Sequence, residues 1–326
     1  MAVPRRSLGV PIVKLGSFRA WLARHHISAL GGGAALGVIR AAFSVGEWVA
    51  PHLAGRLGQA IWFRVPPAPP AAQRNRGLAP GTPLDIVLDG RRLQAFSWGE
   101  GPVVLLMHGW SGWWQQLSVY VEPLVAAGFR VVAWDAPSHG ESAPGRYGRH
   151  YSSIADVMDA TAVVADYLGA VEAIVAHSAG SMAAGVAIAT GLVSPKRVVF
   201  VSPSVTGDDH IAYLTQHLGW GPRTARLVQH YADRRHGVRM ADYNVPQLIA
   251  DSTCDLPEAL FVYDADDYEV PTDSAARLAE HWPGAQVVVT HGFDHFRVLW
   301  APQTIQHAVD FLAGKAVSPT PAVRSR

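Results

Sequence analysis

Runs of apolar residues alternate with amphipathic segments from residue 84 to residue 312. Several runs are continuously apolar, as in Val103-Val104-Leu105-Leu106, which is typical of parallel strands covered on both faces. The pattern predicts strands over 84–88, 93–98, 103–107, 130–134, 172–176, 197–201, 259–263 and 286–290. It predicts helices over 114–127, 154–168, 179–190, 274–281 and 304–312. Such alternation indicates the α/β class: a mostly parallel sheet with helices on both faces.

Turn residues refine this picture at two places. Asp89-Gly90, between the first two predicted strands, indicates a hairpin. Near the N-terminus, helices are expected over 34–50 and 53–63, followed by a proline-rich connector at Pro66, Pro67, Pro69 and Pro70. We therefore expect an N-terminal extension and linker over 1–77, a core formed by 78–205 and 257–313, and a flexible tail over 314–326.

Residues 206–256 interrupt the core with 51 residues between two strands. Compact domains seldom contain a structureless loop of that length. We therefore expect a small helical cap inserted over the carboxyl ends of the strands. Ile211, Leu214 and Leu218 fall near helical spacing, and their apolar stripe could pack the cap onto the core or line a pocket.

Composition narrows the class of protein. The chain has 326 residues, of which 49% are hydrophobic and 16% charged, and its mean hydropathy of +0.11 excludes wholesale disorder. A net charge of +1 gives no electrostatic footprint for nucleic acid. Cys254 is the one cysteine, so the disulfide-stabilised class and a cysteine zinc site are excluded.

The N-terminal segment is basic although the whole chain is nearly neutral. Arg5, Arg6, Lys14, Arg19, Arg24 and Arg40 precede Glu47, the first acid. The longest apolar stretch nearby, residues 27–39, is shorter than the roughly 20 residues of a membrane span, and basic residues interrupt any secretory signal. We therefore expect a cytoplasmic protein. Its basic N-terminus either makes a peripheral contact with anionic membrane or docks as an amphipathic helix on its own domain.

A candidate nucleophile lies where a predicted strand turns into a helix of small residues. The motif Ala176-His177-Ser178-Ala179-Gly180 has the small residues that lift a serine hydroxyl clear of the sheet. A nucleophilic serine needs a base and an orienting acid. Both residue types follow later strands, in the order serine, aspartate, histidine: Asp264, Asp266 and Asp267 after one strand, His291 and His295 after the next.

An oxyanion site is expected beside Ser178. The strand over 103–107 ends in His108-Gly109-Trp110, and this turn can aim the Trp110 amide at the site together with the Ala179 amide. The Trp110 side chain is then expected on the wall of an apolar acyl pocket.

These motifs together resemble the α/β-hydrolase superfamily, in its serine esterase-like form with a cap insertion. The resemblance runs from Leu84 to Leu312 and includes Asp135-Ala136-Pro137-Ser138-His139-Gly140 and Asp267-Tyr268-Glu269-Val270-Pro271. Ala176 and Ser138 stand where glycine is commonest, and neither change removes a reacting group. The resemblance implies that Ser178 is the nucleophile, Asp267 the acid and His295 the base. It disfavours Asp264, Asp266, Asp208 and Asp209 as the acid and His291 as the base, and gives His108, Asp135 and His139 structural roles.

We therefore expect a serine hydrolase of carboxylic esters that acts on a small-molecule acyl ester, with Trp110, Leu214 and Leu218 as substrate contacts and no cofactor. Thioester, amide or C–C bond hydrolysis and acyl transfer use the same groups and stay open, whereas a non-catalytic binding protein fits less well. The cap histidines lack regular ligand spacing, so no metal site is expected from His210, His217, His230 and His236.

Overall fold

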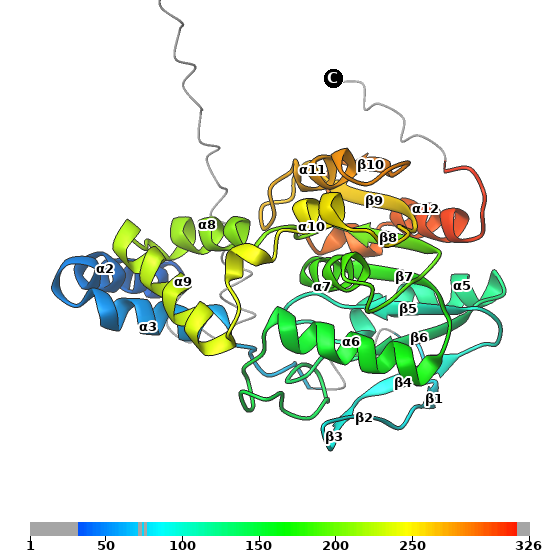
Figure 1. Ribbon diagram of the computed structural model, residues 1–326, viewed down its shortest axis with the longest axis horizontal. Coiled ribbons are helices and arrows are strands. Elements are labelled where there is room, and N and C mark those ends of the chain that lie inside the picture. The colour runs from blue at the N-terminus through cyan, green and yellow to red at the C-terminus, as the bar shows by residue number, and fades with distance from the viewer. Residues whose placement is uncertain (1–31, 71–73, 75–76, 318–326) are drawn as a thin grey trace, which may run out of the picture.

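A single large sheet is the framework of the core (Figure 1). The computed structural model describes residues 32–70, 74 and 77–317, with the backbone alone for 32–35. The basic segment 1–31 and the end of the predicted tail, 318–326, lie outside the described residues. Within them, eight strands follow the order β1-β4-β6-β5-β7-β8-β9-β10. The bounds are Thr82–Pro83 (β1), Ala95–Trp98 (β4), Val103–Met107 (β5), Arg130–Trp134 (β6), Val171–His177 (β7), Arg197–Val201 (β8), Glu258–Asp264 (β9) and Gln286–Thr290 (β10).

The strands from β6 to β10 in this order run parallel, and β4 and β1 join antiparallel at one edge. The carboxyl ends of the parallel strands therefore meet along one edge of the sheet, where ligands of open α/β folds bind. The predicted fold class is confirmed.

The hairpin is confirmed, but one predicted strand is divided. Strands β2 (Ile86–Leu88) and β3 (Arg91–Leu93) form a separate ribbon, and the positive φ of both Asp89 and Gly90 is that of a type I′ turn. The strand predicted over 93–98 is split at Gln94. The amide of Gln94 donates to Ser142 Oγ and its carbonyl accepts from Asp135, so the chain leaves the ribbon there and enters the main sheet as β4.

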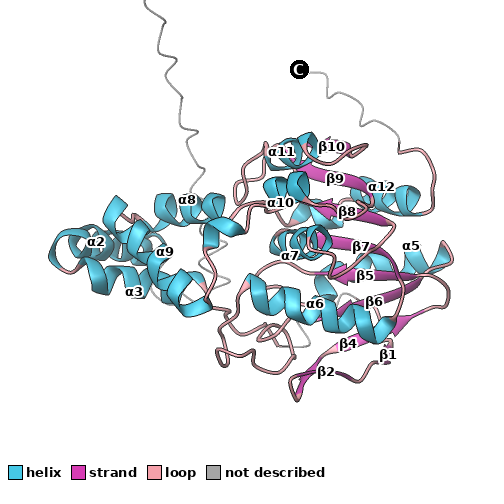
Figure 2. Cartoon of the chain, in the orientation of Figure 1, coloured by secondary structure: helices cyan, strands magenta, loops and turns pink. Residues whose placement is uncertain are grey.

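Helices cover both faces of the sheet (Figure 2). On β5, Val103, Leu105 and Met107 belong to one apolar cluster and Val104 and Leu106 to the other. The first cluster is completed by α6 (Ile154–Leu168), α7 (Ala179–Ala189), α10 (Val245–Asp251) and α11 (Ser274–Glu280). The second is completed by η2 (Trp114–Tyr120), α5 (Val121–Ala126), η4 (Arg297–Trp300) and α12 (Pro302–Leu312).

The helix predicted over 114–127 is wrong as a single α-helix. The structure has a 3-10 helix up to Tyr120, followed by the short helix α5. Pro123 explains the break, because it has no N–H to donate to the carbonyl of Val119 four residues earlier.

The N-terminal helices and the inserted segment pack together as one helical unit, which projects from the core (Figure 1). It contains α2 (Gly32–Val49), α3 (Pro51–Trp62), α8 (Gly207–Leu218) and α9 (Pro222–His236); η3 (Met240–Asp242) and α10 then lead back to the sheet. Gly55 and Gly58 let α3 approach α9 closely, since a Cβ at either position would lie 2.5 Å from Leu227 or Val228.

The buried side chain of Glu47 joins α2 to α9 inside this unit. Its side chain is 5% exposed, and its two carboxylate oxygens accept hydrogen bonds from the amides of Arg223 and Thr224 and from Thr224 Oγ1, at 2.7–2.8 Å. A carboxylate at the first turn of α9 also complements the positive end of the helix dipole. The extension thus forms part of the structure that covers the sheet's carboxyl edge.

Candidate active site

Ser178 occupies a strained turn between β7 and α7. Its backbone has φ 51° and ψ −122°, a conformation that costs a non-glycine residue about 1–3 kcal/mol. The Ser178 amide donates to the Val201 carbonyl at 3.1 Å, which ties the turn to β8. A Cβ at Gly180 would lie 2.5 Å from the His108 carbonyl oxygen, so the turn needs glycine there. The strain is held by the packed strands and points the hydroxyl away from the sheet.

Ser178, His295 and Asp267 form a chain of hydrogen bonds. His295 Nδ1 donates to Asp267 Oδ2 at 2.8 Å, and Ser178 Oγ donates to His295 Nε2 at 2.9 Å. The three residues come from three separate loops, each at the carboxyl end of a strand. Both distances lie in the range required for a nucleophile, its base and the acid that orients the base.

Asp267 is held as an anion. Burial raises its pKa, but the facing His295 and the amides of Glu269 and Val270, which donate to Oδ1 at 2.9 and 3.2 Å, outweigh this and leave the pKa lowered. An ionised Asp267 fixes the proton of His295 on Nδ1 and leaves the Nε2 lone pair directed at the serine.

The competing carboxylates have other partners. Asp264 accepts hydrogen bonds from Thr290 Oγ1 and from the amides of Asp266 and Phe293. Asp266 accepts the amide of Gly292, so both acids shape the loop that carries His295 without contacting its ring. Asp209 pairs with Arg277, Asp208 accepts from Gln229, and His291 is exposed.

The amides of Trp110 and Ala179 lie beside the serine. Both residues line the cavity above Ser178, and neither amide has a hydrogen-bond partner in the described part of the chain. His108 fixes the turn that carries Trp110: its Nδ1 donates to the Gly109 carbonyl at 2.7 Å and its Nε2 accepts the Ala136 amide at 3.0 Å. Burial lowers the pKa of His108 to about 4, so its ring is neutral and serves as a bridge.

The neighbouring loop is organised by Asp135 and His139. Asp135 is buried and accepts hydrogen bonds from the amides of Trp114 and Glu141. Burial raises its pKa to about 7, and these two amides partly offset that rise. His139 donates to the Pro137 carbonyl through Nδ1 and lies edge-on to the Trp110 ring. Both residues thus organise the loop. In the described chain, neither forms a hydrogen bond with Ser178 or His295.

Sequence reasoning missed His177. Its Nε2 donates to the backbone carbonyl of His295 at 2.9 Å, which links the strand carrying the nucleophile to the loop carrying the base. Burial and the facing His295 lower the pKa of His177 to about 3, so the ring is neutral. Its place next to Ser178 in the turn motif was the available signal.

The cavity above Ser178 has a volume of about 70 Å³ and is walled by both the core and the helical unit. The helical unit contributes Ile61, Trp62 and Leu214 to its wall, and Arg64, which follows α3, also lines it. An adjoining hollow of about 40 Å³ has mostly apolar walls. These include Phe63, Ile154, Met182, Met240 and Tyr243.

Two of the three predicted substrate contacts, Trp110 and Leu214, lie in the cavity wall, and Leu218 does not. Trp110 lies in the wall of both hollows, and its indole Nε1 donates to the Arg64 carbonyl at 3.2 Å. Leu214 lies in the wall of the cavity above Ser178. Leu218, one turn further along α8, is 1% exposed and is not among the wall residues of either hollow. It is buried in the apolar cluster shared by the sheet and the helical unit, away from the walls of both hollows, which corrects its assignment as a substrate contact.

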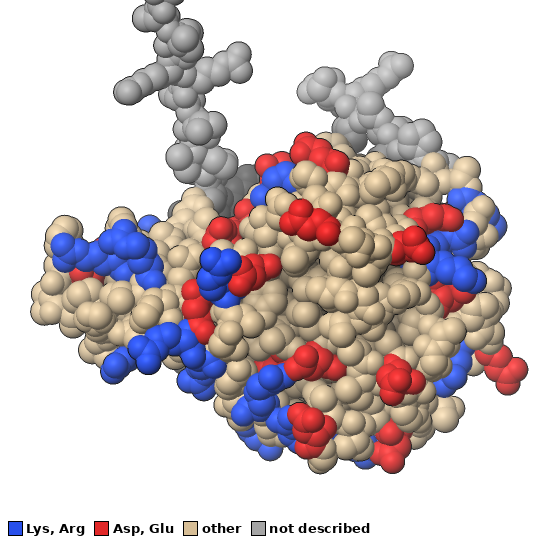
Figure 3. All heavy atoms as spheres, in the orientation of Figure 1, with Lys and Arg blue, Asp and Glu red and all other residues tan. Residues whose placement is uncertain are grey.

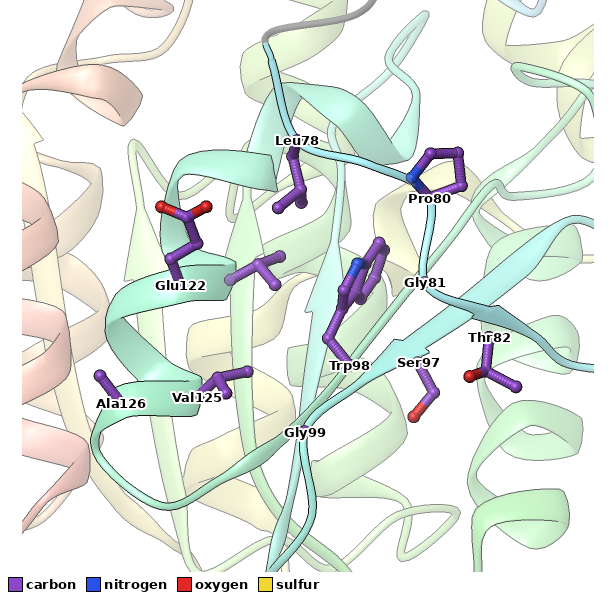
Figure 4. A pocket seen from close by; sticks show the side chains of 11 residues that line it. Leu78, Pro80, Gly81, Thr82, Ser97, Trp98, Gly99, Glu122, Val125 and Ala126 are labelled. Atoms are coloured by element: carbon purple, nitrogen blue, oxygen red, sulfur yellow. The ribbon is translucent and has the colours of Figure 1, made fainter.

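A larger, open hollow of about 820 Å³ lies elsewhere (Figure 4). Leu78, Trp98 and Val125 are among its wall residues. Trp98 pairs with Val131 at the start of β6, so this hollow is at the sheet edge opposite Ser178. Glu122 is its only titratable wall residue, and no nucleophile and base meet there.

The cap histidines do not form a cluster that could hold a metal ion in the described residues. His217 donates to the Tyr213 carbonyl, His210 stacks on Trp62, and His236 packs among Phe63 and Tyr151. Among the helices of 32–70 and 77–317, none is long and apolar enough to cross a membrane.

Comparisons with known proteins bear on the fold and the family of the chain. The non-heme chloroperoxidase CPO-A1 from Kitasatospora aureofaciens is 32% identical over 102 residues, which cover 30% of this chain and 35% of that protein. The chain thus matches about a third of the length of this curated relative. The ferulic acid complex of Est1E from Butyrivibrio proteoclasticus aligns over 71% of this chain and 96% of its own, with 16% identity and a TM-score of 0.54.

The meta-cleavage product hydrolase from Pseudomonas fluorescens aligns over 72% of this chain and 98% of its own, with 19% identity and a TM-score of 0.55. At these identities the two solved structures show a shared fold. The profile of the alpha/beta hydrolase family matches residues 103–322, which include every strand from β5 to β10. The chain therefore belongs to the α/β-hydrolase family.

Proposed function

We propose that this protein hydrolyses carboxylic esters through an acyl-enzyme on Ser178. The observation that carries the proposal is the hydrogen-bonded chain from Ser178 Oγ through His295 to Asp267, placed at a cavity beside two amides that have no hydrogen-bond partner in the described chain. Such an arrangement suits acyl transfer, because it supplies a nucleophile, a base and donors for a developing negative charge.

In the first half of the reaction, Ser178 Oγ attacks the ester carbonyl carbon as its proton passes to His295 Nε2. The carbonyl oxygen becomes an oxyanion, and the amides of Trp110 and Ala179 donate hydrogen bonds to it. Asp267 stabilises the imidazolium while remaining ionised. His295 then protonates the departing alkoxide, the C–O bond of the leaving group breaks, and the acyl group stays on Ser178.

In the second half, a water molecule replaces the alcohol. His295 Nε2 removes a proton from this water as its oxygen attacks the acyl carbon. The tetrahedral intermediate uses the same two amides. When it collapses, the proton on His295 returns to Ser178 Oγ and the carboxylic acid is released.

The walls of the site favour a short, uncharged acyl group. The adjoining hollow of about 40 Å³ holds only a few atoms, and its walls are mostly apolar. Glu269 adds a carboxylate whose Oε2 lies 4.0 Å from His295 Nε2. A negative charge at this point disfavours acyl groups that carry their own carboxylate.

Thioesters, amides, C–C bonds and acyl transfer to an alcohol would use the same acyl-enzyme. They differ in the leaving group or in the acceptor that displaces the acyl group. Product analysis with an alcohol acceptor present separates hydrolysis from transfer, because transfer yields a new ester in place of the acid.

Turnover of p-nitrophenyl esters of increasing acyl length tests the proposal, with Ser178→Ala and Ser181→Ala compared. Ser181 lies three residues along α7 and bonds the Ala176 carbonyl, so it is a matched serine without contact to His295. We expect activity on short-chain esters that Ser178→Ala abolishes and Ser181→Ala retains. A folded wild-type protein without activity on any ester of the series would overturn the proposal.

A further inference from the structure

The exposed faces of α2 and α3 carry six large apolar side chains, which we call the stripe: Val38, Val45, Trp48, Val49, Leu53 and Leu57. These side chains are between 52% and 78% exposed. They are six of the eleven large hydrophobic side chains that are exposed in the described residues, although α2 and α3 are a small part of the chain. Exposed apolar residues gathered in this way mark an interaction surface.

The stripe follows from the sequence of α2, which is apolar on two faces. Leu36, Ile39 and Phe43 face the interior of the helical unit. Val38, Val45 and Val49, spaced by seven and four residues, lie on the opposite face and meet solvent. A helix in water needs only one apolar face, so the second face is available to a partner.

Basic side chains flank the stripe. The Arg223 guanidinium lies over the Trp48 ring at 5.1 Å, and Arg56 stands between Leu53 and Leu57 on α3, with its guanidinium over Tyr231. Arg226 is exposed one turn after Arg223. Figure 3 shows Lys and Arg side chains gathered over this end of the molecule.

The acids of the same helices do not cancel this charge at the surface. Glu47 is buried against the start of α9, as described above. Asp233 is partly buried and accepts the Met240 amide at 2.8 Å. The stripe is therefore an apolar surface with a basic border and no exposed acid on α2, α3 or α9.

We propose that the stripe docks the protein onto an anionic lipid surface. Apolar side chains that enter the headgroup region and arginines that meet anionic lipid are the two contributions to such binding. Residues 1–31 add five basic residues and no acid. Their charge has the same sign as the border of the stripe, so charge favours their binding the same lipid over their covering the stripe. A second copy of the chain docked on the stripe would bring two basic borders together, so charge disfavours it as the partner.

Docking has a geometric consequence for the site. Helix α3 leads directly into Ile61, Trp62 and Arg64, which line the cavity above Ser178. A lipid surface held against α2 and α3 therefore lies on the helical side of that cavity. The docking itself does not depend on the proposed ester chemistry.

Flotation of the full chain with vesicles tests the proposal. Vesicles of phosphatidylcholine alone are compared with vesicles that also contain phosphatidylglycerol, at low and high salt. We expect binding to the anionic vesicles that weakens with salt. Val49→Ser with Leu53→Ser should reduce the partition coefficient roughly tenfold or more. Arg56→Gln with Arg223→Gln should reduce it roughly 30-fold, about fivefold for each charge.

Matched controls carry the same changes on the core. Leu192→Ser with Val287→Ser removes two exposed apolar side chains, and Arg92→Gln with Arg149→Gln removes two exposed arginines. These controls should bind as the wild type does, and the melting temperature of every variant shows that it is folded. Wild type that does not bind, or that binds neutral vesicles equally well, would overturn the proposal. Stripe variants that bind like the wild type would also overturn it, because residues 1–31 would then act alone. So would a wild-type protein that does not bind vesicles and instead forms a dimer that the stripe variants abolish.

Discussion

The acyl-length preference should depend on Leu214 and not on Leu218. Both leucines lie on α8, one turn apart, and both are buried, with 3% and 1% exposed. Leu214 lines the cavity above Ser178, whereas Leu218 is buried in the apolar cluster and lines neither hollow. The pair therefore separates a pocket effect from a packing effect with the same chemical change.

The size of the effect follows from the carbons removed. Replacing leucine by alanine deletes three side-chain carbons. An acyl chain that is two or three methylenes longer can fill this space, which stabilises its transition state by about 1.6–2.4 kcal/mol. This corresponds to a rise of roughly 15- to 60-fold in kcat/KM relative to the short ester. Both substitutions should also lower the free energy of unfolding by about 2–5 kcal/mol.

The assay is the ratio of kcat/KM for longer and shorter p-nitrophenyl esters, with the melting temperature of each variant. We expect Leu214→Ala to move the preference towards longer chains and Leu218→Ala to lower the melting temperature with the profile unchanged. The reasoning would be refuted if both variants moved the preference equally, or if Leu214→Ala cost stability alone.

Three further outcomes follow from other contacts. Asp267→Asn should lower kcat by roughly 10⁴-fold with little change in KM, because His295 loses the anion that fixes its tautomer; a loss below tenfold would assign the acid elsewhere. Glu269→Gln should raise kcat/KM for a succinate half-ester relative to a butyrate ester by about fivefold, since it removes from the cavity wall a like charge whose repulsion is on the order of 1 kcal/mol; an unchanged ratio would separate Glu269 from acyl selection. Glu47→Gln should lower the free energy of unfolding by about 1–3 kcal/mol at neutral pH. Burial raises the pKa of Glu47, but Thr224 and the α9 amides leave it below its ordinary 4.5. The advantage of the wild type over the glutamine variant is therefore present above about pH 4.5 and disappears as pH falls through the lowered pKa. Urea denaturation across pH measures this, and a difference that does not change with pH would contradict the ionised cap.

The sheet could be predicted from the sequence because its strands carry their own signal. Val103–Met107 is apolar at every position, and the structure buries all five residues. Ser178, Asp267 and His295 could be placed near one another because each follows a strand whose carboxyl end reaches the same edge. The breaks at Gln94 and Pro123 were missed, since one depends on hydrogen bonds to residues over 40 positions away and the other on one absent N–H among helix-forming neighbours.

The helical unit could not be predicted from local pattern. Glu47 and Thr224 are 177 positions apart, and nothing in the apolar periodicity of either segment shows that they meet. The same limit applies to Leu214 and Leu218, because their spacing predicts a shared helix face but not where the cavity ends along that face. The wall residues from the end of α3, such as Trp62, lie in a segment that the sequence presents as a separate extension.

The central claim is that Ser178 is the nucleophile of an acyl-transfer site. Labelling with a fluorophosphonate probe, followed by mass spectrometry of the labelled peptide, tests it most directly. We expect one adduct on Ser178, suppressed by prior incubation with a short-chain ester, absent in Ser178→Ala and strongly slowed in His295→Ala. An adduct on another residue, or labelling of the folded Ser178→Ala protein at the rate of the wild type, would contradict the claim.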